Sequence, residues 1–367
     1  MVRRTLSIPD AAPLTGPTMT RFLLAAAVAA AVTAAARPRP PAPVRHAVEA
    51  KDARRVVGVL TYHVTCPELR AKEWLVYAAA PELPGQTKVK TTLAPAGKAG
   101  KESGPPPRPL VVAKVPATTA DLQTTIPIRV TYEATLRART LVELPPDAVA
   151  PKVAPLPAAE RKLYLAENGD IDFRHETVQK WLRDEGLVRT TEDEVAFART
   201  VLRRLRDRMT YTYAADLDRR ASAVCAAGRS DCGGLAVLFV AALRASGVPA
   251  RALYGRWAAS AVPDATLGGA AYLQWHVKAE FFAAGVGWVP ADPGGAVQHD
   301  RTPGGLTYFG TDPGDFITFH TDPHLALDTG TTGVRPVRNL QTPVWWVTGR
   351  GPTTPTRVVE DWKVEAK

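Results

Sequence analysis

The most informative stretch of this 367-residue sequence covers residues 230–251 and reads SDCGGLAVLFVAALRASGVPAR. The run Leu235–Leu243 is apolar on every face of a helix, which predicts a helix buried in the core. Gly247 follows at the place where a glycine commonly ends a helix in the left-handed conformation. Cys232 lies in the first turn, where unpaired backbone N–H groups carry partial positive charge and favour a thiolate. The stretch therefore predicts a nucleophilic cysteine at the start of a buried helix.

A histidine and an aspartate follow at positions from which both could reach this thiol. His276 lies in the second of three strand-like segments, and Asp292 comes directly after the third. The short connection between these two segments predicts neighbouring antiparallel strands, so the imidazole and the carboxylate could meet. A carboxylate fixes the tautomer of an imidazole that activates a nucleophile. The sequence thus predicts a catalytic triad of Cys232, His276 and Asp292. The three segments are residues 250–257, 273–282 and 287–291.

This part of the chain resembles the transglutaminase-like superfamily through three motifs. In that superfamily a Gly/Asp-Cys pair opens an apolar helix, which leads into an R-x-x-G-(I/V)-P-A-R segment. A histidine on a strand and a G-W-x-x-x-D-P segment follow. The matching residues here, in family order over about residues 230–293, are Asp231-Cys232, Arg244–Arg251, Trp275-His276-Val277 and Gly287–Pro293. More loosely, Tyr211-Thr-Tyr213 and Trp345-Trp346 suit the flanks of the family module.

The resemblance implies an α+β fold with a papain-like core, in which Cys232 begins a buried helix packed on an antiparallel sheet that carries His276 and Asp292. It also implies an acyl-thioester intermediate, which transglutamination, deamidation, peptide cleavage and glycoamidase chemistry share. The chain lacks the paired CxxC zinc elements of peptide N-glycanases and any acidic cluster suggestive of the calcium sites of animal transglutaminases. We therefore expect thiol-dependent acyl transfer or hydrolysis on glutamine carboxamides or peptide bonds, without a cofactor or a metal site.

Each of the three residues also has a structural interpretation. A free cysteine is most often a small buried core residue, and Asp292 before Pro293 could be a turn aspartate. His276 could be a core histidine, but it shares its strand face with Lys278 and Glu280, which favours a cleft. The occurrence of all three residues in family order favours catalysis. Two alternatives stay open: a cysteine peptidase of cell-envelope peptides, and a catalytically idle interaction module.

The region before this module is rich in strand patterns. Four segments of β-branched and aromatic residues, separated by turn residues, predict a sandwich-like β-rich domain over residues 46–150. They are residues 56–65, 73–79, 110–115 and 126–136. Further on, Thr191 and Glu194 form a capping box that predicts the start of a helix. We expect the catalytic domain to span residues 157–348 and a C-terminal tail to span residues 349–367.

The N-terminal residues predict export. Arg21 precedes an apolar run at residues 22–32, and small residues that fit a signal-peptidase site follow. We expect a signal peptide over residues 1–36, with translation starting at Met19, and a proline-rich linker over residues 37–45. The protein would then be periplasmic or extracellular, and an uncleaved signal that tethers it to the membrane is the alternative. We expect no integral membrane span in the mature chain, because no other stretch is apolar enough.

The charge pattern limits the partners. The formal net charge is +10, but the excess is spread along the chain, and no nucleic-acid-binding motif occurs. The densest basic run, residues 199–208, is expected to be the solvated face of a helix. We therefore expect a protein or peptide substrate and no nucleic acid, and the sequence leaves the oligomeric state open.

The remaining cysteines and histidines have weaker interpretations. Cys66 and Cys225 could form a disulfide that would leave Cys232 as the free thiol. His320 and His324 have the spacing of a metal-binding pair. A proline lies between them, which argues against a shared helix, so we expect both histidines in surface loops rather than in a metal site.

Overall fold

A buried helix packed on an antiparallel sheet forms the centre of the computed structural model, which describes residues 45–367 except 80, 96, 105–106, 191–192 and 301–303. Helix α6 (Cys232–Ala245) has all its residues from Gly233 to Arg244 buried. The sheet has the order β13–β12–β9–β15, and neighbouring strands are antiparallel. The expected α+β fold is therefore confirmed. The strands are β9 (Ala250–Trp257), β12 (Trp275–Ala283), β13 (Gly287–Ala291) and β15 (Phe316–Thr321).

The two faces of strand β12 differ as its alternating sequence predicts, because successive side chains of a strand point to opposite faces. The apolar face joins the same hydrophobic core as α6 and consists of Val277, Ala279 and Phe281. The other face consists of His276, Lys278 and Glu280, all of which are buried. The polar face is thus enclosed by other parts of the chain rather than by solvent.

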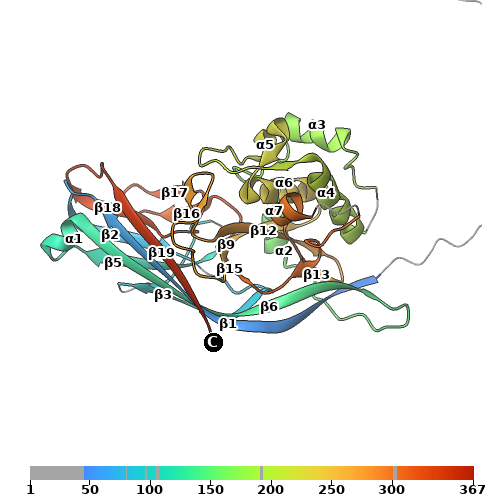
Figure 1. Ribbon diagram of the computed structural model, residues 1–367, viewed down its shortest axis with the longest axis horizontal. Helices are drawn as coiled ribbons and strands as arrows, with labels where there is room; N and C mark the ends of the chain where they lie inside the picture. The colour runs from blue at the N-terminus through green and yellow to red at the C-terminus, as the bar shows by residue number, and fades with distance from the viewer. Residues whose placement is uncertain (1–44, 80, 96, 105–106, 191–192, 301–303) are drawn as a thin grey trace, which may run out of the picture. The chain divides into compact units, whose positions relative to one another are not determined.

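Helices lie over the apolar face of this sheet, and the long strands β1 (Arg45–Thr65) and β6 (Thr125–Leu144) run along its other side (Figure 1). Helix α4 begins at Glu194, and its N-cap is Asp193, whose side chain accepts a hydrogen bond from the Ala196 N–H at 2.9 Å. The prediction that Thr191 caps this helix is therefore wrong, and Thr191 itself lies outside the described residues. The other helices are α1 (Ala120–Thr124), α2 (Ala158–Leu163), α3 (Glu176–Asp184), α4 (Glu194–Arg208), α5 (Ala221–Ala227) and α7 (Pro293–His299).

Two further antiparallel sheets form the β-rich region. One has the order β14–β6–β1–β19, with β3 also paired to β6, and the other has the order β18–β2–β5–β4. Their facing side chains form a second hydrophobic core around Trp74, Tyr132 and Trp362. The four predicted strand segments are all present in these sheets. They correspond to β1, β2, β5 and β6. The strands of these sheets other than β1 and β6 are β2 (Arg70–Ala78), β3 (Gln86–Ala94), β4 (Lys98–Lys101), β5 (Pro109–Pro116), β14 (Thr311–Asp312), β18 (Val344–Arg350) and β19 (Arg357–Ala366).

The C-terminal residues complete these sheets, which differs from the expected tail at residues 349–367. Strand β19 pairs with β1 from Val56 opposite Ala366 to Thr65 opposite Arg357. Its Trp362 is fully buried over Gly58, where an added Cβ would lie 2.3 Å from the indole ring. Strand β18, expected at the end of the catalytic domain, pairs with β2. The β-rich region is therefore built from strands at both ends of the described chain.

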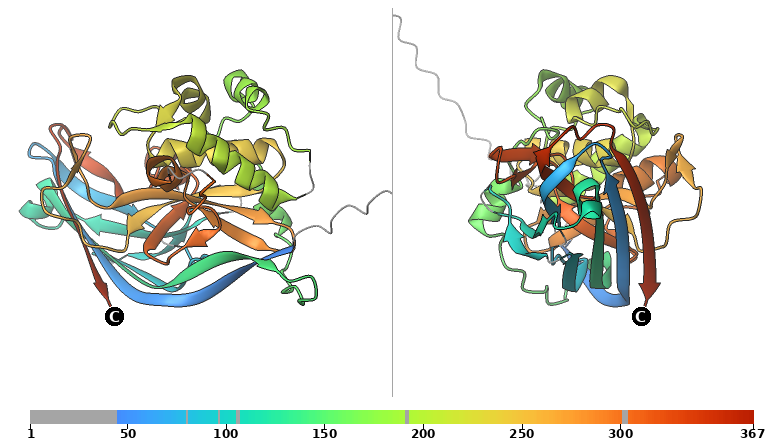
Figure 2. Two further views of the ribbon diagram at one scale, coloured as in Figure 1. Left: turned by 45° about the vertical axis from the view of Figure 1, so that its right-hand side comes forward. Right: turned by 90° about the vertical axis from the view of Figure 1, so that its left-hand side faces the viewer.

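Strand β15 connects the sheet β13–β12–β9–β15 with the β-rich region. Ile317 and Phe319 of β15 belong to the core around Trp362, while β15 itself is hydrogen-bonded to β9. Strands β1 and β6 curve past the sheet β13–β12–β9–β15 (Figure 2). Arg139 of β6 bonds Glu280 of β12 at 2.8 Å. The polar face of β12 is therefore covered by the β-rich region.

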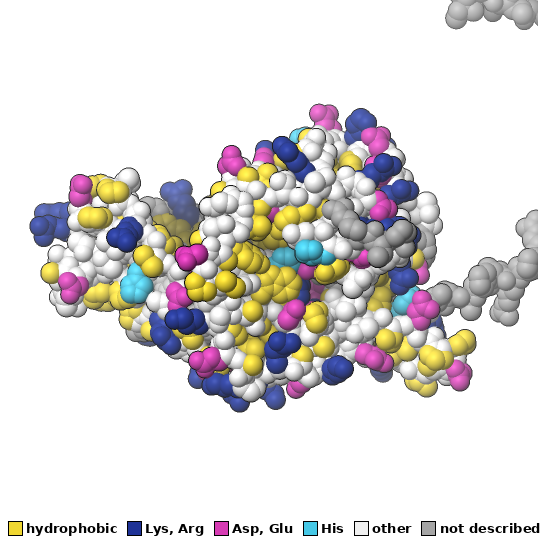
Figure 3. Space-filling view, in the orientation of Figure 1, with side chains coloured by type: hydrophobic (Ala, Val, Ile, Leu, Met, Phe, Trp, Pro, Cys, Tyr) yellow, Lys and Arg dark blue, Asp and Glu magenta, His cyan; other side chains and the backbone are white. Residues whose placement is uncertain are grey.

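Short strand pairs connect these parts: β7 (Thr210–Tyr211) with β8 (Arg229–Ser230), β10 (Thr266–Leu267) with β11 (Ala270–Ala271), and β16 (Leu325–Asp328) with β17 (Val334–Val337). On the face seen in Figure 3, acidic and basic side chains alternate around a middle zone of hydrophobic side chains, with no single basic patch. Within the described ranges, no helix is long and apolar enough to cross a membrane. The predicted signal peptide and the start at Met19 lie outside those ranges.

Candidate functional site

Cys232 is the first residue of helix α6, directly after an N-cap aspartate. The Asp231 carboxylate accepts hydrogen bonds from the Gly233 and Gly234 N–H groups at 3.0 and 3.2 Å. Arg219 in turn donates to Asp231 from Nε at 2.8 Å and from Nη2 at 2.6 Å. A carboxylate beside a thiolate would repel it, so the Arg219 guanidinium offsets that charge while Asp231 caps the helix.

Helix α7 brings Asp292 to the same place. Asp292 is the N-cap of α7, and its Oδ1 accepts a hydrogen bond from the Gly295 N–H at 2.8 Å. Gly294 lies against Cys232, since a Cβ added to it would be 2.9 Å from the Cβ of Cys232. Only glycine therefore allows the start of α7 to approach the start of α6 so closely.

His276 connects the carboxylate to the thiol. Its Nε2 donates to Asp292 Oδ2 at 2.7 Å, which leaves Nδ1 for a second partner. The Cys232 thiol lies close enough to the same imidazole to help raise its pKa. The ring of Trp257 stacks on the imidazole with centroids 4.4 Å apart. The structure thus brings all three residues of the predicted triad together.

Charge favours a protonated imidazole. Burial lowers the pKa of His276, but the charge and the hydrogen bond of Asp292, together with the contact to Cys232, outweigh burial and raise it to about 10. Burial raises the pKa of Asp292, while the charge and hydrogen bond of His276 and the charge of Lys278 lower it below its ordinary value. An imidazolium between a carboxylate and a thiol stabilises the thiolate form of that thiol.

Lys278 is a residue of this site that the sequence interpretation did not include. Its ammonium is buried and lies 3.1 Å from Asp315 Oδ1 and 3.4 Å from Asp312 Oδ1. It also lies 4.7 Å from the centre of the Trp257 ring that stacks on His276. The alternation of His276, Lys278 and Glu280 contained the signal, because a lysine on an enclosed strand face requires acidic partners.

A cavity of about 280 Å³ opens beside Cys232 and His276. Aromatic residues form much of its wall, namely Tyr213, Tyr254, Tyr272 and Trp275. Within the part of the chain that the structure describes, the buried Nε1 of Trp275 has no hydrogen-bond partner. The Tyr211 hydroxyl is a hydrogen-bonding neighbour of the Cys232 thiol, and burial together with the charges of Cys232 and Asp231 raises the pKa of Tyr211.

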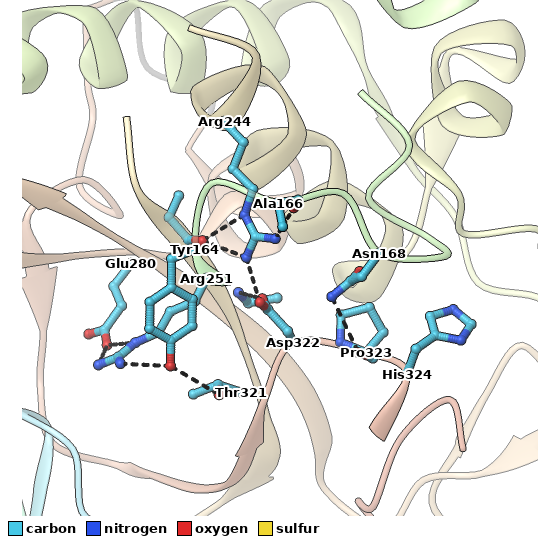
Figure 4. Close-up of polar contacts among 12 residues, drawn as sticks. Tyr164, Ala166, Asn168, Arg244, Arg251, Glu280, Thr321, Asp322, Pro323 and His324 are labelled. Carbon is cyan, nitrogen blue, oxygen red and sulfur yellow. Dashed lines mark hydrogen bonds and ion pairs between the residues drawn. The ribbon is translucent and has the colours of Figure 1, made fainter. Parts of the chain in front are cut away.

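The arginines of the R-x-x-G-V-P-A-R segment hold the sheet rather than a substrate (Figure 4). Arg244 donates to the carbonyl oxygens of Ala250 and Ala166 at 2.7 Å each, and to the Asp322 carboxylate. Arg251 donates to Glu280 Oε1 at 2.7 Å and to the Tyr164 hydroxyl at 3.3 Å. These bonds tie the end of α6, strand β9 and strand β12 together. The motif therefore fixes the positions of the elements that carry Cys232 and His276.

The two histidines of the H-x-x-x-H pair have separate partners. His320 is buried in strand β15, so its predicted place in a surface loop is wrong. Its Nδ1 donates to the Asp322 carbonyl and its Nε2 accepts from the Leu340 N–H, and burial lowers its pKa to about 3. His324 bonds the Asp170 carboxylate at 3.0 Å. The two imidazoles therefore serve packing and hydrogen bonding.

The other two cysteines are unpaired. Cys66 is buried in the core of the β-rich region and Cys225 lies on helix α5, so the disulfide between them that the sequence left open is absent. Burial and the charge of Asp172 raise the pKa of Cys225 to about 12. Cys225 is therefore a thiol at neutral pH, without the histidine partner that Cys232 has.

Comparison with known proteins identifies the class of this module. Residues 183–293 match the model of the transglutaminase-like superfamily, and they form a domain of that superfamily. The fold is similar to that of a candidate cysteine protease from Cytophaga hutchinsonii, with a TM-score of 0.53 and 11% identity over 87% of this chain and 92% of that one. A looser similarity exists to the periplasmic domain of TgpA from Pseudomonas aeruginosa, with a TM-score of 0.34 and 12% identity over 68% and 92% of the two chains. A comparison with curated proteins gives no match.

Proposed function

We propose that this protein is a cysteine acyltransferase or hydrolase that uses Cys232, His276 and Asp292 as a catalytic triad. The observation that carries the proposal is the hydrogen bond between His276 and Asp292, with the Cys232 thiol near the same imidazole at the start of helix α6. The superfamily domain at residues 183–293 supports it. The substrate carbonyl belongs to a glutamine carboxamide or to a peptide bond.

The first half of the reaction forms a thioester. The Cys232 thiolate attacks the carbonyl carbon, and the carbonyl oxygen becomes an oxyanion. The Cys232 backbone N–H is at the first helical position, where it has no acceptor within the helix, so it can donate to this oxyanion. His276 then gives its proton to the departing nitrogen, and ammonia or an amine leaves.

The second half of the reaction releases the acyl group. His276, now neutral, takes a proton from water or from a substrate amine as that nucleophile attacks the thioester carbon, and the thiolate departs. Water gives hydrolysis and an amine gives a cross-link. Asp292 holds Nε2 throughout, so that Nδ1 stays directed to the reacting atoms.

The test is turnover of glutamine peptides and of a peptide library by the protein and two cysteine variants. Cys232→Ala should lose activity by roughly a thousandfold or more, because the thioester can no longer form. Cys225→Ala, which removes a protonated thiol outside the site, is the matched control. Ammonia release with amine incorporation indicates a transglutaminase, whereas new peptide termini indicate a peptidase. Full activity of Cys232→Ala would refute the triad.

Thiol labelling separates an enzyme from an idle interaction module. Iodoacetamide at mildly acidic pH should alkylate Cys232 faster than Cys66 or Cys225, since thiolates rather than thiols react. Equal and slow labelling of all three in the folded protein would favour the module.

We also propose that the protein acts outside the cytoplasm on protein or peptide substrates of the cell envelope or the medium. The support is the signal-like pattern around residues 22–32, together with the small residues that follow. Mass spectrometry of the mature protein should find an N-terminus near residue 37. A peptide that contains Arg3 or Arg4 would refute translation from Met19.

A further inference from the structure

The wall of the cavity beside Cys232 carries one cationic side chain whose hydrogen-bond donors the fold does not use up. Besides the triad, three ionised residues line this cavity: Arg219, Asp231 and Arg338. Arg219 and Asp231 neutralise each other, and Arg219 also donates to the carbonyl oxygens of Leu217 and Ala214. The other cationic residue of the wall is Arg338, which also has a carboxylate partner, Asp170, but whose side chain is 41% exposed.

Arg338 is anchored from one side only. Its Nε donates to Asp170 Oδ2 at 2.8 Å, and the other oxygen of Asp170 bonds His324. Burial raises the pKa of Asp170, but the bonds from His324 and Arg338 lower it below its ordinary value, so the anchor is ionised. Within the described residues, Nη1 and Nη2 of Arg338 have no hydrogen-bond partner. A guanidinium fixed at Nε that keeps both Nη groups can bind a carboxylate through two parallel bonds.

Two other polar side chains of the wall, Asp231 and Gln341, are already engaged. Asp231 is occupied by Arg219 and by the N-terminal N–H groups of α6. Gln341 uses its Nε2 to donate to the carbonyl oxygens of Gly255 and His276. The carboxylate of Asp218, which also lies within the electrostatic range of Arg338, is paired with Arg220. The Nη groups of Arg338 therefore remain as donors that require an acceptor on the ligand.

We propose that the cavity takes an acyl donor that carries a carboxylate close to the reacting carbonyl, and that Arg338 binds this carboxylate. The inference rests on the proposed acyl chemistry and narrows its substrates to acidic peptides. The aromatic wall, with Tyr213, Tyr254 and Tyr272, covers the apolar part of the donor. The volume of about 280 Å³ is near the lower end of the roughly 300–1,000 Å³ of ligand pockets. The carboxylate is therefore that of an adjacent side chain or of a nearby chain terminus.

The test compares matched peptides in two assays. A five-residue peptide with a central glutamine is made with each flanking alanine replaced in turn by glutamate, glutamine or lysine, and with a free or an amidated C-terminus. Turnover is measured with the active protein, and binding is measured by calorimetry with Cys232→Ala. Glutamate at one position, or the free C-terminus, should raise kcat/KM at least about tenfold over its amide counterpart, as a charge-assisted bidentate pair requires. Lysine at the position where glutamate raises kcat/KM should lower kcat/KM.

Arg338→Met should reduce the ratio of kcat/KM between the acidic peptide and its amide counterpart to near one. Arg338→Lys should keep part of it, because lysine retains the charge but not the fork of donors. Arg335→Met is the matched control, since Arg335 is exposed on strand β17 of the same hairpin and does not line the cavity. Equal kcat/KM for glutamate and glutamine peptides, or a preference that survives in Arg338→Met, overturns the inference. Binding of acidic peptides to Cys232→Ala without turnover by the native protein would instead refute the acyl chemistry and leave the carboxylate site standing.

Discussion

Replacing Gly294 by alanine tests whether the approach of helices α6 and α7 assembles the site. The new Cβ would lie 2.9 Å from Cys232 Cβ and 3.0 Å from Cys232 Cα, where carbon atoms normally keep about 3.5–4.0 Å. Backbone forms part of this contact, so side-chain rotation cannot relieve it. The start of α7 must then move away from α6 by roughly 0.6–1 Å to restore that spacing.

The expected effect on activity is larger than the effect on stability. Overpacking of this kind costs about 1–3 kcal/mol, and the better helix propensity of alanine returns about 1 kcal/mol of it. Asp292 caps α7 and moves with it, so its bond to His276 and the placement of the imidazole against Cys232 are disturbed. A misplacement of about 1 Å can cost about a hundredfold in rate. We expect kcat/KM and the alkylation rate of Cys232 to fall together by about that factor.

The matched control is Gly285→Ala in the turn between β12 and β13. Gly285 has a φ of +74° and open space around it, so alanine there costs about 1–2 kcal/mol through backbone strain alone. The free energy of unfolding should fall comparably in both variants, while only Gly294→Ala loses alkylation rate and turnover. If Gly294→Ala keeps both, the close packing of α7 against Cys232 does not position the triad.

Three further predictions concern charge and packing. In Asp292→Asn, the stability lost relative to the native protein should be largest near pH 5–6 and shrink as pH rises through about 10. The reason is that the raised pKa of His276 stabilises the fold fully below its unfolded value of about 6.5 and no longer does so above 10; a gap in unfolding free energy that grows from pH 7 to 11 would contradict this. Glu280→Gln should cost about 3–5 kcal/mol in urea unfolding, because Arg251 loses its carboxylate partner and Arg139 keeps only Asp312, and a loss below 1 kcal/mol would show that neither arginine depends on Glu280. Trp362→Ala should cost about 3–5 kcal/mol, whereas alanine at the exposed Val359 of the same strand should cost little; equal losses would argue against Trp362 as a core residue.

The candidate catalytic site could be predicted from the sequence because the signals that define it are local. The apolar run after Cys232, the glycine that ends it and the strand patterns on either side of His276 each predict one element, and α6, β9, β12 and β13 follow these bounds closely. The alternation on β12 also separates the apolar from the polar face correctly. The family resemblance adds the order of the three residues, and it matches the domain at residues 183–293.

What the sequence did not predict depends on contacts between distant segments. The sequence predicted a polar face that includes Lys278, but not that strand β14, paired with β6, supplies the carboxylate of Asp312 as its partner. The alternating pattern of residues in β19 (Arg357–Ala366) is short and partly charged, so the sequence did not predict a strand there. Its pairing with β1 is what makes it one. The free donors of Arg338 likewise become meaningful only once Asp170, far away in the sequence, binds its Nε.

The pairing of β19 with β1 has a consequence for how the polypeptide is made. Ten residues of β1 pair with β6 on one side and find their partners on the other side only in residues 357–366, so that edge of the first sheet stays open while everything between is synthesised. Leu60, with no exposure in the finished protein, would meanwhile lack the cover that Trp362 gives to its core. Expression with a tag fused close behind residue 366, or loss of the last strand to a protease, should therefore cause aggregation through strand addition at that edge rather than a gradual loss of activity.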